Sequence, residues 1–150
     1  MNRYLLIAML SGGIVAGILD IGAAAAINRK SPTVILRVIA SGLRGSIALE
    51  GGASASTLGF VLQLAMGIVI AAVYGVASLW MPILARMWIA GGLVYGVGVF
   101  VVMTYVVLPL SAAPSRPPPA ISKLAKDVLA MLGFGLIISY AVCRASFQVT

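Results

Sequence analysis

The sequence predicts an all-α integral membrane protein, a bundle of four transmembrane helices with an amphipathic or re-entrant helix between the first two spans. The 150-residue chain is 62% hydrophobic and only 9% charged, whereas a soluble domain is about 25% charged. Four apolar runs, separated by short segments rich in basic residues, Gly or Pro, are each long enough to cross a bilayer as a helix. The length fits one membrane domain, residues 1–150.

The first predicted span covers residues 4–27 and is flanked by Arg3 and by the polar segment 28–30. At the helical rise, roughly 24 residues cover about 36 Å, which is enough to cross with some tilt. Arg3, the apolar run and the alanines at 23–26 also resemble a signal peptide. We favour a span, because the apolar run before Asp20 is long for a signal peptide and further spans follow.

Asp20 lies inside this first span, about seven residues or roughly 10 Å from its end. An acidic side chain in a membrane helix is costly, so it is protonated, paired with a cation or exposed to water. It can be a carboxylate that handles protons or ions. It can also be a packing group that accepts hydrogen bonds from a neighbouring segment, which is the interpretation that a single carboxylate favours.

Residues 32–48 are predicted to form the amphipathic helix. A Ser–Pro pair is a good helix start, apolar residues recur at i, i+3 and i+4, and a pair of glycines follows. A narrower stripe carries Arg37 and Arg44. The helix either lies in the membrane interface with its arginines towards lipid headgroups or tucks against the bundle as a re-entrant segment. Both arrangements place an arginine near the membrane face of Asp20, and if the protein has a site, we expect the pairing of Asp20 with this arginine to be part of it.

Three further spans complete the predicted bundle. The second span, residues 58–80, follows a small-residue segment at 51–57 that has the composition of a flexible linker. A tight turn connects it to the third span, residues 88–110. The proline-rich segment 111–120 is predicted to be a stiff connector. The fourth span, residues 124–143, has the shortest apolar run.

Small and polar residues inside the spans predict contacts between helices. Gly67, Ala71 and Gly75 recur at four-residue spacing, which allows another helix to approach closely. Such faces point to homo-oligomerisation or to a membrane-protein partner. Gln63 on the same span is more typical of a hydrogen bond between helices than of substrate binding.

Basic residues predict the orientation of the chain. Four spans place the connectors 28–57 and 111–127 on one side, and these carry more basic residues than the other side does. The positive-inside rule assigns that side to the cytoplasm and both termini to the periplasm. The connectors hold Arg29, Lys30, Arg37, Arg44, Arg116, Lys123 and Lys126, against Arg3, Arg86 and Arg144 on the other side.

Several classes of chemistry have no support in the sequence. The chain has no His, which excludes His-containing zinc sites, His-ligated haem and a Ser-His-Asp triad. No P-loop or GxSxG motif is present, so we expect no enzyme, cofactor or metal. The basic residues lie between apolar runs, which predicts the lipid bilayer as partner and no nucleic acid. The candidate polar site consists of Asp20, Arg37, Arg44, Glu50 and Gln63.

Three stretches of the chain carry a resemblance to a known group: GGIVAGILD, LRVIASGLRGSIALEGG and YVVLPLSAAPSRPPP. In these motifs and in its architecture the chain resembles small bacterial inner-membrane proteins of the YagU-like type, a largely uncharacterised group. The resemblance implies a bacterial cytoplasmic membrane and four helices, and it implies no specific activity. The group has a His in its second span where this chain has Gln63, which puts any His-based chemistry in doubt here.

The favoured function from the sequence is an accessory or interaction protein of the bacterial inner membrane. The alternative is a small channel or transporter in which Asp20 lines a polar cavity together with Arg37 or Arg44. An enzyme is the least favoured class, since general acid–base chemistry would require Asp20 and the distant Glu50 to converge.

Overall fold

The computed structural model describes residues 3–115 and 117–147, and within these ranges the chain forms helices and no strand. Arg116, one of the basic residues counted for the orientation, lies outside the described part. Four segments of that part are long and apolar enough to span a membrane. The predicted fold class is therefore confirmed. The segments are α1 (Arg3–Asn28), α4 (Gly52–Trp80), the run Trp88–Leu110 and α8 (Ile121–Phe147).

The third span contains a change of helical pitch. It consists of α6 (Trp88–Val102), a π-helical turn η1 (Met103–Val107) and the short α7 (Leu108–Leu110). Single π-helical turns inside α-helices are rare and occur frequently at functional sites. The turn is therefore a marker for the part of the bundle that carries a site.

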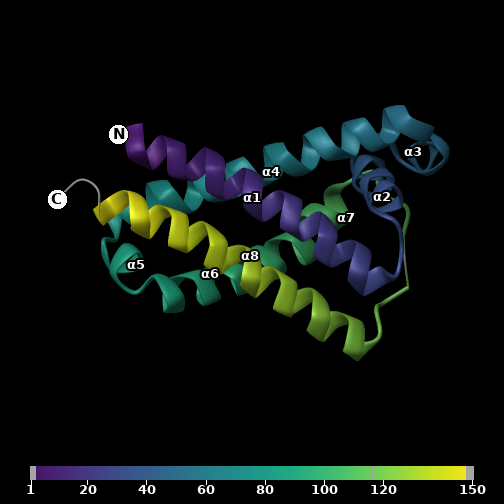
Figure 1. Ribbon diagram of the computed structural model, residues 1–150. Coiled ribbons are helices and arrows are strands. Elements are labelled where there is room, and N and C mark those ends of the chain that lie inside the picture. The colour runs from purple at the N-terminus through teal and green to yellow at the C-terminus, as the bar shows by residue number, and fades with distance from the viewer. Residues whose placement is uncertain (1–2, 116, 148–150) are drawn as a thin grey trace.

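The two connectors that were predicted to share one side of the membrane lie together. Figure 1 shows α2 (Pro32–Arg44), α3 (Ile47–Glu50) and α7 at one end of the bundle, and α5 (Ile83–Arg86) with both chain ends at the other. The backbone N–H of Ala112 donates a hydrogen bond to the carbonyl oxygen of Gly42 (2.9 Å), which joins the connectors directly. We call this the connector end.

The amphipathic helix differs from the prediction for residues 32–48. The helix α2 ends at Arg44, and a separate short helix α3 follows. Gly45 between them has φ 69° and ψ −158°, a backbone conformation that residues with a side chain rarely adopt. The helix buries Ile35, Ala40 and Ser41 against the bundle. In Figure 1 it is seen nearly along its axis, so it crosses the end of the bundle instead of running along it.

Residues 51–57 were expected as a flexible linker, but all except Gly51 are helical and supply the first turns of α4. They pack against the amphipathic segment in a small cluster of buried alanines, Ala40, Ala48 and Ala55. The Ser56 hydroxyl donates hydrogen bonds to a backbone carbonyl of α2 and to one in its own helix, both at 3.3 Å. Tertiary packing thus overrides the weak helix preference of this segment.

Glycines bring the spans into close contact inside the bundle. A Cβ added to Gly13 of α1 would lie 2.7 Å from the carbonyl oxygen of Gly67 and from the Cα of Ile68 in α4. The contact between α6 and α8 is equally close, since a Cβ on Gly135 would lie 2.8 Å from the backbone nitrogen of Gly96. These small-residue faces are therefore occupied by packing within the chain.

The packed core fills the half of the bundle near α5 and the chain ends. Tyr74, Ile138 and Val142 are fully buried there. The Tyr74 hydroxyl donates to the carbonyl oxygen of Leu84 (3.1 Å), and Tyr95 donates to that of Ile70 (2.6 Å). The side-chain hydroxyls are thus satisfied by backbone groups, as a water-poor interior requires. The opposite half, towards the connector end, is more open.

Candidate functional site

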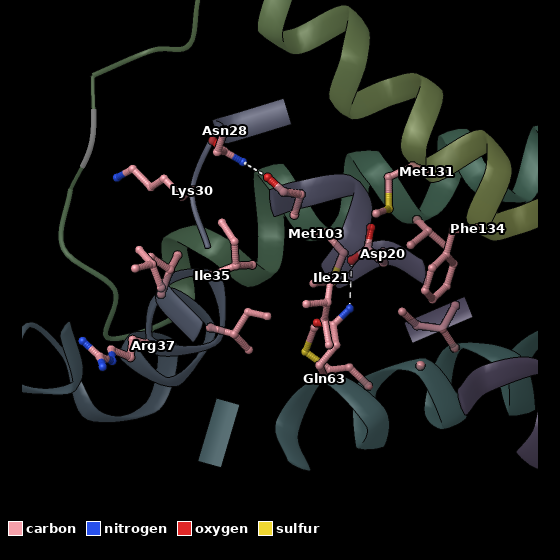
Figure 2. Close-up of a pocket in the computed structure, with 18 of the residues that line it drawn as sticks. Asp20, Ile21, Asn28, Lys30, Ile35, Arg37, Gln63, Met103, Met131 and Phe134 are labelled. Atoms are coloured by element: carbon pink, nitrogen blue, oxygen red, sulfur yellow. Dashed lines mark hydrogen bonds between the residues drawn. The ribbon is translucent and has the colours of Figure 1, made fainter. Parts of the chain in front are cut away.

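A cavity of about 680 Å³ lies in the half of the bundle towards the connector end. It is lined by residues of α1, α2, α4, α6, η1 and α8, so every span contributes to it. Its volume falls in the range of roughly 300–1,000 Å³ that is typical of small-molecule sites. Figure 2 shows the cavity with its polar residues.

The polar centre of the cavity is a pair formed by Asp20 of α1 and Gln63 of α4. The Gln63 amide Nε2 donates a hydrogen bond to Asp20 Oδ2 at 2.8 Å (Figure 2). Gln63 is only 5% exposed. A Cβ on Gly17, one turn before Asp20, would lie 3.4 Å from the Gln63 carbonyl oxygen, so the small residue keeps the two helices close enough for this bond.

Cationic and amide side chains occupy the part of the cavity nearest the connector end, which we call the basic rim: Asn28, Lys30 and Arg37. Asn28 Nδ2 donates to the carbonyl oxygen of Ala24 (2.7 Å) near the end of α1. Figure 2 shows the charged ends of Lys30 and Arg37 pointing away from Asp20. The buried Arg37 Nε has no hydrogen-bond partner among the described residues.

The remaining walls of the cavity are mostly apolar. Three methionines from three different helices, Met66, Met103 and Met131, line the cavity together with the buried ring of Phe134. Methionine side chains are flexible and polarizable, and they adapt to ligands of different shape. Met103 is also the first residue of the π-helical turn η1. The cavity is therefore an adaptable apolar space with polar groups at two ends.

The structure brings three of the five predicted site residues together and leaves two apart. Asp20, Gln63 and Arg37 line the same cavity. Arg44 and Glu50 are exposed and do not line it. The expected ion pair between Asp20 and an arginine is not present within residues 3–115 and 117–147, where the recorded ion pair joins Lys123 to Asp127. Gln63 takes the place of the arginine as partner of Asp20.

Sequence reasoning did not identify Asn28, Lys30 or the three methionines as site residues. Asp20, Ala24 and Asn28 recur every four residues and so share one face of α1, a signal that the sequence contains. The methionines come from separate helices and have no common spacing. Asp20 also borders a smaller cavity of about 220 Å³ that Asp127 helps to line, so a second carboxylate lies on the α8 side of the polar centre.

Comparisons of the chain with protein-family models, curated proteins and solved structures find no match. The geometry of the site is therefore the basis for its functional interpretation. The four apolar helices identify a multi-pass membrane protein, and the cavity with the Asp20–Gln63 pair is its most distinctive internal feature.

Proposed function

We propose that this protein is a small membrane channel or transporter whose solute site is the cavity around Asp20 and Gln63. One observation carries the proposal: a carboxylate inside a membrane span borders a cavity of small-molecule size and has one amide as its hydrogen-bond partner. Ionisable side chains within spans are costly and are commonly found on substrate, ion or proton pathways. Water or a polar solute in the cavity supplies the contacts that the described residues do not.

In the sequence, the glycine-rich faces pointed to homo-oligomerisation or to a membrane-protein partner, as an accessory protein would have. The glycines at 13, 67, 96 and 135 instead face other helices of the same chain. The outer surface carries residues such as Val94, Val101 and Leu129, which are suited to contact with lipid tails. Packing within the chain thus accounts for the small-residue pattern. The cavity, which this packing does not explain, is the feature on which we base the function.

We place the connector end on the cytoplasmic side of a bacterial inner membrane, with both termini in the periplasm. The larger number of basic residues in the connectors supports this orientation. The resemblance to YagU-like proteins supports the same membrane. In this orientation the cavity lies in the cytoplasmic half of the bundle, and its basic rim is at the level of the lipid headgroups.

The proposal assigns binding and passage of a solute and no covalent reaction. The polar centre consists of a carboxylate and an amide. Catalysis by a carboxylate needs an adjacent acid, base or nucleophile to work with it, and the amide of Gln63 is none of these. We therefore include no enzymatic activity or cofactor in the proposed function.

Flux measurements in proteoliposomes test the proposal. A trapped pH-sensitive dye reports proton entry, and osmotic swelling in isotonic glycine, glucose or potassium chloride reports solute entry. We expect flux of at least one of these probes above that of protein-free vesicles. Asp20→Asn should reduce it by about tenfold or more, because the charged hydrogen-bond acceptor is lost.

Glu50→Gln is the matched control, because Glu50 is an exposed acid outside the cavity. It should leave the flux unchanged. Absence of flux for all four probes in the wild-type protein would overturn the proposal. Equal flux in the wild type and in Asp20→Asn would show that Asp20 takes no part in the transport.

A further inference from the structure

Two parts of one cavity carry ionisable side chains of opposite type that do not pair with each other. Asp20 lies at the polar centre, and Lys30 and Arg37 lie at the basic rim. Within residues 3–115 and 117–147, none of these three side chains takes part in an ion pair. The Arg37 Nε, moreover, is buried without a hydrogen-bond partner. Buried donors in native proteins are normally satisfied, so the Arg37 Nε at the rim has unused capacity for a ligand, and Asp20 can accept hydrogen bonds besides that from Gln63.

The separation of the two ends follows from the helix that joins them. Asn28 at the rim is two turns beyond Asp20 on α1, which corresponds to about 12 Å along the helix. The basic side chains of the rim form no direct ion pair with Asp20 among the described residues. Figure 2 agrees with this, since the charged ends of Lys30 and Arg37 point away from Asp20. A single ligand can satisfy both ends only if it is about as long as two helical turns.

The cavity wall between the two polar groups determines which chemical group fits as the middle part of such a ligand. Ile35 and Met103 line the cavity there (Figure 2) and present hydrocarbon and thioether groups. A hydrocarbon chain fits these walls, whereas a small inorganic ion would leave them in contact with water. An amphiphile with one charge would satisfy one end and leave the other uncompensated.

The sign of the charge at each end fixes the orientation. Asp127 borders the smaller cavity next to Asp20, and its own partner Lys123 is 2.6 Å away. That ion pair occupies Asp127, so Asp20 is the acid of the main cavity: its carboxylate favours a cation, and Lys30 with Arg37 favours an anion. A guanidinium is well suited to a carboxylate, because its planar fork matches the geometry of the two oxygens.

Building on the proposed function, we propose that the cavity binds an unbranched dipolar amphiphile, with an ammonium group at Asp20 and a carboxylate at Lys30 and Arg37. An apolar chain of about two helical turns, roughly 11 Å, separates the two groups. The proposal names the substrate class of the site, an ω-amino acid of medium chain length.

Binding of three probes of equal chain length to the full-length protein in detergent tests this assignment by equilibrium dialysis. The probe ω-aminooctanoate carries both charges, ω-aminooctanamide lacks the carboxylate, and ω-acetamidooctanoate lacks the ammonium. We expect the dipolar probe to bind at least about tenfold more tightly than either probe with one charge, because each end contributes a charge-assisted hydrogen bond. Equal binding of all three, or no binding of any, would overturn the inference.

Variants separate the two ends of the site. Arg37→Gln should abolish the advantage of ω-aminooctanoate over the amide probe, and Asp20→Asn should abolish its advantage over the acetamido probe. Arg44→Gln and Glu50→Gln remove exposed charges outside the cavity and should change neither ratio. Should a variant fail to fold, as judged by circular dichroism, the three-probe ratio of the wild-type protein still decides the question. Ratios that change as much in the controls as in the cavity variants would contradict the assignment.

The outcomes distinguish this inference from the proposed function. Tight binding of ω-aminooctanoate with no flux of that compound or of any other probe into proteoliposomes would overturn transport and leave the binding assignment standing. Flux of another solute that depends on Asp20, with no preference among the three probes, would overturn the assignment and leave transport standing.

Discussion

The close contact between α1 and α4 predicts that one methyl group added at Gly13 destabilises the protein. In Gly13→Ala the added Cβ would lie 2.7 Å from backbone atoms of α4, whereas ordinary van der Waals contact begins at 3.4 Å. These atoms belong to helix backbones and cannot rotate away. The helices must therefore separate by about 0.7 Å, the difference between the two distances.

The magnitude follows from the packing that is lost. A gap of this size forfeits roughly a quarter to a half of the dispersion energy across the affected contact. Overpacked sites of this kind cost about 2 kcal/mol. The same substitution raises the intrinsic helix propensity by about 1 kcal/mol, which partly offsets the cost. Gly22→Ala on the same helix is the matched control, because a Cβ there meets nothing within 4 Å.

The propensity gain cancels when the two alanine variants are compared. We expect Gly13→Ala to be less stable than Gly22→Ala by about 2 kcal/mol, a factor of about 30 in the folding equilibrium. Unfolding by sodium dodecyl sulfate in mixed micelles, followed by far-ultraviolet circular dichroism, measures this difference. Equal stability of the two variants would refute the close α1–α4 contact and, with it, the basis for the Asp20–Gln63 bond.

Three further predictions address the polar centre, the amphipathic segment and the orientation. Gln63→Leu removes the hydrogen bond to Asp20 and should lower the free energy of unfolding by about 1–3 kcal/mol; wild-type stability in the same titration would contradict this. Gly45→Ala places a side chain at φ 69° and should lower the free energy of unfolding by about 1–2 kcal/mol. Thermal unfolding of this variant and of the Gly22→Ala control measures the difference. In a background without the native cysteine, Ser46→Cys should react with a membrane-impermeant thiol reagent only from the cytoplasmic side and Met81→Cys only from the periplasmic side. The reverse pattern would invert the proposed topology.

The spans were predictable because their determinants are local. A long apolar run with charged flanks indicates a membrane helix without knowledge of any neighbour. The bounds of the amphipathic segment were harder to predict from the sequence. The helix α2 ends at Arg44 and residues 52–57 are helical, because these segments pack against each other and against the neighbouring spans. Contacts of that kind depend on residues far apart in the chain and have no local pattern.

The candidate site was predictable in its composition but not in its pairing. Placing polar groups in apolar spans costs free energy, so the sequence alone indicated Asp20 and Gln63 as candidate site residues. Which group becomes the partner of Asp20 depends on the contact between α1 and α4, where Gly13 and Gly67 allow a close approach. That approach brings Gln63 to the carboxylate, while α2 crosses the end of the bundle and the charged end of Arg37 points away from Asp20.

The central claim is that the cavity around Asp20 is an aqueous solute site inside the membrane. Thiol labelling of single-cysteine variants in vesicles, in a background with Cys143→Ala, tests it most directly. Ala24 lines the cavity, whereas Ile18 on the same helix does not and is 47% exposed on the outer surface. Thiols ionise and react in water and stay inert in lipid. We predict that Ala24→Cys reacts with a water-soluble thiol reagent, that ω-aminooctanoate slows this reaction, and that Ile18→Cys does not react. Reaction of Ile18→Cys with no reaction of Ala24→Cys would contradict the account.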